Sequence, residues 1–80
     1  MDAAVFTEGN GIWRVNAAPS MRGLADLVKG ADGAVTIEPD AGSDLEAIHR
    51  GPYATLEDAM AAIGAHLGGQ CRFVPPRRHW

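Results

Sequence analysis

Only a few residues of this 80-residue chain have the chemical type and spacing that catalysis requires. His49 and Arg50 are adjacent, and a histidine beside an arginine at a strand end has the chemistry to bind an anion or to serve in acid–base catalysis. The alternative is a half-exposed pair at a sheet edge. Cys71 is the single cysteine, and a lone thiol near an aromatic residue such as Phe73 is more typical of a small core residue than of a nucleophile.

Other arrangements that would identify an enzyme or a metal site do not occur in the sequence. Ser20 and Ser43 are the two serines, and their contexts favour a helix cap and a turn rather than a nucleophile in a G-x-S-x-G motif. The acidic segment 38–46 lacks the ligand spacing of a calcium loop, the histidines and the cysteine lack zinc spacing, and no glycine-rich phosphate loop is found. The sequence therefore predicts no enzyme, no catalytic residue, no metal site and no cofactor.

Three surfaces are candidates for binding. At the N-terminus of a predicted first helix, Ser20, Arg22 and free backbone N–H groups would hold a small anion or an amino acid. The C-terminal tail, 75–80, contains two prolines that favour an extended backbone, and its cationic and aromatic residues suit a protein or nucleic-acid partner. An uncovered face or edge of the sheet is the third surface, and Trp13 would mark it if its indole is exposed there. With the histidine–arginine pair, the candidate binding residues are Trp13, Ser20, Arg22, His49, Arg50, Arg77, Arg78 and Trp80.

The pattern of apolar and turn-forming residues predicts the elements of the first half. A Gly-Asn-Gly turn signal separates two apolar segments, 4–7 and 11–17, which predicts an opening hairpin. Apolar residues then recur at helical spacing after Ser20, so a first helix is predicted over 21–29. The β-branched segment 33–38 predicts the next strand.

The second half repeats this pattern. Segment 45–50 is predicted as an antiparallel partner of 33–38, although neither alternating set of its residues is cleanly apolar. Thr55, with Asp58 three residues later, predicts the capped start of a second helix. The apolar stripe of that helix would be Leu56, Met60, Ile63 and Leu67. Segment 70–74 predicts a final strand.

The predicted order is βαββαβ, a small two-layer α+β sandwich of ferredoxin-like topology with a possible extra N-terminal strand. Its length fits a single domain over 1–74 followed by the extended basic tail. The stretch Gly23-Leu24-Ala25-Asp26-Leu27 resembles the start of the first helix in amino-acid-sensing ACT domains, which share this order. That resemblance implies a ligand at the helix N-terminus. The RNA-binding RRM family also shares the order, but its aromatic-rich strand motif is missing here, and no family is identified.

Composition limits the partners and the location. The hydrophobic share is 46%, but alanine supplies 14 of these 37 residues, whereas Leu, Ile, Val and Phe together supply 16. We therefore expect a thin core that is stabilised by self-association. A formal net charge of −3 disfavours nucleic acid without excluding it. No segment approaches the ~18 apolar residues of a membrane span and no signal-peptide pattern opens the chain, so we expect no membrane association and a cytoplasmic location.

These observations do not determine a function. The hypothesis that fits them best is a small, non-enzymatic interaction or regulatory module that forms a homodimer through its sheet and presents a surface to a protein partner. One alternative is a nucleic-acid-associated regulator, in which the basic tail joins Arg14, Arg50 and Arg72 in a local positive patch. The other alternative is a sensor of a small anion or amino acid at the first-helix N-terminus.

Overall fold

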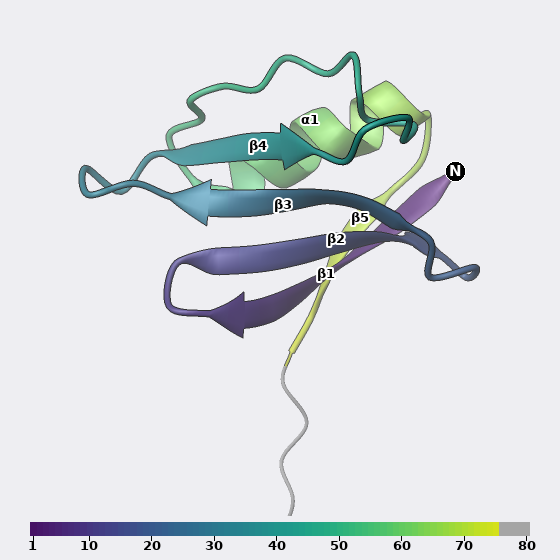
Figure 1. Cartoon of the computed structure of the whole chain (residues 1–80), viewed down its shortest axis with the longest axis horizontal. Helices are drawn as coiled ribbons and strands as arrows, with labels where there is room; N and C mark the ends of the chain where they lie inside the picture. Colours follow the sequence, from purple (N-terminus) through teal and green to yellow (C-terminus); the bar gives the residue numbers. More distant parts are fainter. Residues whose placement is uncertain (76–80) are drawn as a thin grey trace, which may run out of the picture.

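Five strands and one helix form the part of the chain, residues 1–75, that this computed structural model describes (Figure 1). The elements are β1 (Asp2–Gly9), β2 (Ile12–Ala18), β3 (Gly23–Lys29), β4 (Val35–Pro39), α1 (Leu56–Leu67) and β5 (Cys71–Val74). The order is ββββαβ, so the predicted βαββαβ sandwich of ferredoxin-like topology is wrong. The ACT-like interpretation fails with it, because 23–27 lies in β3 and does not begin a helix.

The strands form one sheet in the order β4-β3-β2-β1-β5. The first four strands are antiparallel to their neighbours, whereas β5 runs parallel to β1. Between β4 and β5, the chain crosses one face of the sheet through α1 and so passes from one edge to the other (Figure 1). The N-terminal strand, expected only as an optional addition, therefore lies inside the sheet, between β2 and β5.

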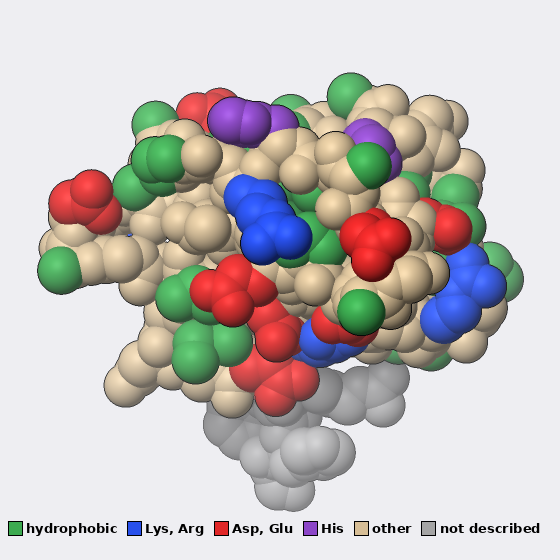
Figure 2. Space-filling view, turned by 45° about the horizontal axis from the view of Figure 1, so that its top comes forward, with side chains coloured by type: hydrophobic (Ala, Val, Ile, Leu, Met, Phe, Trp, Pro, Cys, Tyr) green, Lys and Arg blue, Asp and Glu red, His purple; other side chains and the backbone are tan. Residues whose placement is uncertain are grey.

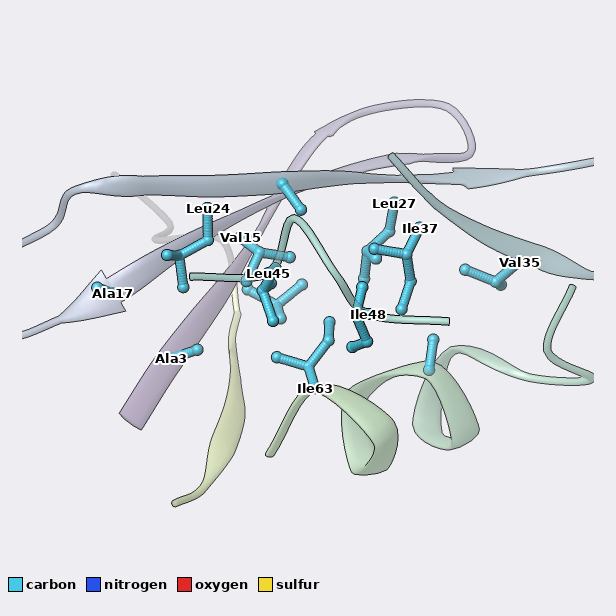
Figure 3. Close-up of a cluster of buried hydrophobic side chains, with 13 residues drawn as sticks. Ala3, Val15, Ala17, Leu24, Leu27, Val35, Ile37, Leu45, Ile48 and Ile63 are labelled. Atoms are coloured by element: carbon cyan, nitrogen blue, oxygen red, sulfur yellow. The ribbon is translucent and has the colours of Figure 1, made fainter. Parts of the chain in front are cut away.

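One face of the sheet contributes most of the core. Val5, Val15 and Ala25 lie opposite one another on β1, β2 and β3, and all three are fully buried. Helix α1 and the loop of residues 40–55, which we call the cover loop, pack against this face. Figure 3 shows side chains from the sheet and from the cover loop converging above Ile63 of α1.

The predicted first helix is a strand because its apolar residues also satisfy a bulged strand pattern. Ala25 and Leu27 alternate toward the core, whereas Asp26 and Val28 alternate away from it. A register shift between Val15 and Asn16 of β2 lets Leu24 be buried as well, although it precedes Ala25 directly. The bulge therefore produced the three-residue spacing that resembled a helix.

Segment 45–50 is not a strand but a series of turns within the cover loop. Ser43 starts it by accepting a hydrogen bond from the Leu45 N–H at 3.3 Å, and the Ile48 N–H donates to the Leu45 carbonyl at 3.0 Å. Leu45 and Ile48, three residues apart, both point into the core (Figure 3). A strand would place them on opposite faces, which explains why no inward face could be assigned from the sequence.

The predicted opening hairpin, the strand near 33–38 and the second helix are confirmed. The Thr55 hydroxyl accepts a hydrogen bond from the Asp58 N–H at 3.1 Å, as a capped start requires. Ala59, Ile63 and Gly64 are the buried residues of α1, and the other members of the apolar stripe pack at the margin of the core. The final strand, predicted over 70–74, is also present as β5.

The outer surface carries a mixture of residue types. Figure 2 shows charged side chains of both signs, histidines and small hydrophobic areas interspersed on the side where β4 lies. Within residues 1–75, no helix combines the length and the apolar character needed to cross a membrane.

Candidate interaction site

The two edges of the sheet differ in how their backbone groups are satisfied. At the β4 edge, Val35 and Tyr53 exchange two backbone hydrogen bonds of 2.8 Å, and the Ile37 N–H donates to the Arg50 carbonyl at 2.8 Å. The cover loop therefore pairs with β4 from outside. Both backbone groups of Val35 and the N–H of Ile37 are therefore not available to another chain.

The β5 edge has no such cover in the described chain. The inner side of β5 pairs with β1, and the Ala3 N–H donates to the Gln70 carbonyl at 2.8 Å. Because successive residues of a strand direct their backbone groups to opposite sides, Arg72 faces β1 while Cys71 and Phe73 direct their N–H and C=O groups outward. No residue within 1–75 pairs with these groups.

Two apolar side chains lie exposed on this edge strand. Phe73 has 41% of its surface exposed and extends on the same face of the sheet as α1, opposite Val5. Val74 is 38% exposed and lies on the other face. An edge strand with open backbone groups and exposed apolar side chains is a template for pairing with another chain.

A shallow groove of about 430 Å³ runs between α1 and β5. Its lining residues are Glu57, Met60, Ala61, Gly64, Gly69, Gln70, Cys71 and Arg72. Gly64 lets the helix approach the strand, because a Cβ there would lie 3.0 Å from the Gly69 carbonyl oxygen and 3.4 Å from the Cys71 nitrogen. The floor of the groove is thus formed by closely packed backbone, and its walls are mainly apolar.

The thiol of Cys71 belongs to this groove and is not poised to react. Burial raises the pKa of Cys71 to about 11, from an ordinary value of 9.0. At pH 7 only about one thiol in ten thousand is then ionised, and the thiolate is the nucleophilic form. Cys71 therefore acts here as a small apolar residue, in agreement with its predicted role as a core residue.

The two charged residues that line the groove have opposite signs. Glu57 lies in the first turn of α1 and is exposed. The Arg72 guanidinium donates to the Gln70 side-chain oxygen from Nε at 2.9 Å and from Nη2 at 2.6 Å. Arg72 is therefore oriented along its own strand, and the groove carries no net charge from these two residues.

Arg14, which sequence analysis placed in a positive patch, is neutralised by neighbouring acids. Its Nη1 lies 2.9 Å from Asp26 Oδ1 and 3.2 Å from Asp40 Oδ1, and its Nη2 also donates to Asp40. The hydrogen bond with Asp40 raises the pKa of Arg14; burial opposes this shift and Asp26 adds to it. This cluster ties β2 and β3 to the start of the cover loop, and its guanidinium is not available to a phosphate.

His49 and Arg50, the most site-like pair in the sequence, lie exposed in the cover loop. The Tyr53 hydroxyl donates to the His49 carbonyl at 2.6 Å, and the two rings meet edge-on with centroids 6.0 Å apart. Arg50 contributes its carbonyl to the β4 edge. The backbone of this pair therefore helps to cover β4, and its side chains are not joined to another candidate residue.

The predicted anion site required the N-terminus of a first helix, but the structure has a strand, β3, in place of that helix. Ser20 lies in the β2–β3 turn, and the Arg22 guanidinium forms an ion pair with Asp44 at 2.8 Å. Trp13 is half-buried on the α1 face of the sheet, where it packs against the core, rather than on the open face. Arg77, Arg78 and Trp80 of the predicted tail lie outside the described residues.

Residues 1–75 contain no group of three or more histidine, cysteine or acidic side chains placed to hold a metal ion. No protein-family model, curated protein or solved structure matched the chain when each kind was compared with it. The feature that sequence reasoning missed is the β5 edge, with Phe73 on it. The sequence feature that could have indicated this edge is the short apolar strand followed by Pro75, because proline is tolerated in edge strands and ends strand pairing.

Proposed function

We propose that this protein is a non-enzymatic interaction module whose binding surface is the edge of β5 with the adjoining groove. The observation that carries the proposal is the contrast between the two edges. The cover loop pairs with β4, whereas Cys71 and Phe73 direct outward, beside exposed apolar surface, backbone groups that have no partner among residues 1–75. A cytoplasmic location and the absence of catalysis are parts of the same proposal.

The surface offers the two components of recognition by strand addition. Outward backbone groups on β5 supply affinity that does not depend on the partner's sequence, and a side-chain groove beside them supplies specificity. The groove here is lined by Met60, Ala61 and Cys71. Methionine adapts to different apolar side chains because it is flexible and polarisable, which suits it to a binding wall.

Site-specific photo-crosslinking in the producing cells tests the proposal. A photoreactive phenylalanine analogue replaces Phe73, and in a matched variant it replaces Ile12, which is 43% exposed but lies on β2, away from this edge. We expect a discrete cross-linked adduct from position 73 and none from position 12. The mass of the adduct, which depends on the partner, is not part of this test. Equal cross-linking from both positions, or none from position 73, would show that the β5 edge is not the binding surface.

A further inference from the structure

The shape and chemistry of the β5 edge identify a partner. We infer that the edge is occupied by a second copy of this chain, with the two β5 strands paired antiparallel about a two-fold axis at Phe73. This inference rests on the proposed function and names the occupant of the same surface. In the dimer, the two sheets join into one continuous sheet, and both α1 helices lie on the same side of it.

Backbone direction restricts the register of this pairing. Only residues whose backbone groups face outward bond across the seam. On β5 these are Cys71 and Phe73, and the same alternation directs the carbonyl of Pro75, directly after the strand, outward as well. With Phe73 opposite the partner's Phe73, the two residues exchange backbone hydrogen bonds, and each Cys71 N–H reaches the carbonyl of the partner's Pro75. This register makes about four main-chain hydrogen bonds. Because Pro75 has no N–H, pairing stops there.

The charge of Arg72 selects this register over its neighbour. If the axis passed through Arg72, a similar number of hydrogen bonds would form, but the two arginines would lie directly opposite each other. Like charges in that position are destabilising. With the axis at Phe73, Arg72 lies opposite the partner's Val74 and the two aromatic rings lie across the seam, an arrangement that favours pairing.

The side chains of the surface complement one another. Phe73 is an exposed apolar side chain on the face of the sheet that carries α1, and the partner's Cys71 is its diagonal neighbour in this register. Cys71 lines the groove together with Met60 and Ala61. Each Phe73 is therefore directed toward the groove of the other copy, where ring and sulfur atoms attract each other.

A second copy also fits the surface better than an unrelated extended peptide. The short edge offers a peptide only a few main-chain bonds, whereas a second copy adds its own Phe73 and α1 to the contact. Glu57 and Arg72 give the groove opposite charges, so two copies meet there without net repulsion. The contact is small relative to interfaces of ~1,200–2,000 Å², so we expect dimers at micromolar concentrations rather than below.

Sedimentation equilibrium on the purified chain tests whether the partner is a second copy. We expect a reversible monomer–dimer equilibrium between about 1 and 100 µM, which is the range where small interfaces act. Phe73→Lys should shift it to monomer, while Ile12→Lys, at an equally exposed apolar position outside the seam, should dimerise like the wild type. Far-UV circular dichroism and urea unfolding are the controls that check whether both variants are folded.

Cysteine trapping tests the register. Wild-type chain, whose thiol is Cys71, is mixed with a Cys71→Ala/Phe73→Cys variant and oxidised with a mild disulfide catalyst, so that Arg72 is retained in both chains. Because opposite residues in an antiparallel pair lie within disulfide range, we expect the disulfide between two residues 73 to form faster than the mixed disulfide between residues 71 and 73, about tenfold or more. Faster formation of the mixed disulfide, which an axis at Arg72 would favour, would overturn the register at Phe73.

The sedimentation and photo-crosslinking results together separate this inference from the proposed function. A strictly monomeric wild type across the whole concentration range, or dimers unaffected by Phe73→Lys, would overturn the second copy as occupant. If position 73 still gave a photo-adduct whose mass corresponds to a different protein, the interaction module would stand while the dimer fell. A wild-type dimer together with an adduct of twice the chain mass would support both.

Discussion

The β4 and β5 edges belong to the same sheet, but the described chain covers the backbone of β4 and leaves the outer side of β5 without a partner. The cover loop brings the backbone of Arg50 and Tyr53 against β4, and it is held there by its own buried side chains. β5 is four residues long, is followed by Pro75 and receives no such partner from residues 1–75. Unprotected edges favour pairing with other chains, so the contrast with the covered β4 edge is the reason for proposing the β5 edge as a contact surface.

The largest effect should come from removing the anchor of the cover loop. Leu45 is fully buried between the sheet and α1, so Leu45→Ala should lower the free energy of unfolding by about 2–5 kcal/mol through lost burial and the cavity that remains. Urea unfolding followed by circular dichroism measures the loss. The exposed neighbour Ala47 provides the control, since Ala47→Ser should change stability by less than about 0.5 kcal/mol. Similar values for both variants would mean that the cover loop is not held by its core contact.

A smaller effect should follow from loss of the helix cap. Thr55 begins α1 two residues after Tyr53, the last residue that covers β4, and its hydroxyl accepts the Asp58 N–H. Thr55→Ala should therefore cost about 1 kcal/mol. Thr55→Ser retains the accepting oxygen and should remain close to the wild type in the same urea assay. An equal loss in both variants would assign the effect to the threonine methyl group instead of the cap.

The last effect concerns the open edge and appears only in alkaline solution. The pKa of Cys71 is raised in the folded protein to about 11, so between pH 9 and 11 the folded chain retains a proton that the unfolded chain has lost. Stability that is complete below pH 9 should therefore decline as pH rises through this window. The difference in unfolding free energy between wild type and Cys71→Ala, measured at pH 7, 9 and 10.5, isolates this thiol from other titrating groups. A constant difference would indicate that the thiol is not desolvated.

Local signals in the sequence were sufficient for some elements and insufficient for others. The hairpin and α1 were predictable because a Gly-Asn-Gly turn and a Thr55 cap are decided by neighbouring residues. β3 was not, because a bulge that depends on its pairing with β2 altered its apolar spacing. The predicted topology was wrong because of this error and because the turns of segment 45–50 were interpreted as a strand.

The proposed binding surface was harder to predict than the elements. Phe73 and Val74 have ordinary strand composition, and whether a strand becomes an edge depends on the arrangement of all five strands. The cover over β4 is equally non-local, because it relies on Leu45 and Ile48 reaching the core from a segment with no regular period. Of the candidate residues, His49 and Arg50 lie in this cover and not at the β5 edge.

The parallel pairing of β1 with β5 has a consequence for the order in which the protein assembles. The partners of one side of β1 are residues 71–74, whereas β2 follows it directly in the chain. During synthesis, the antiparallel strands and their hairpins emerge first, and β1 waits with one side unpaired until almost the whole described chain has been made. A nascent chain in that state presents a longer and more apolar edge than the finished protein does. In such a chain, the segment from Ala3 to Phe6, which pairs with β5 in the finished sheet, is therefore open to wrong pairing until the last strand is added.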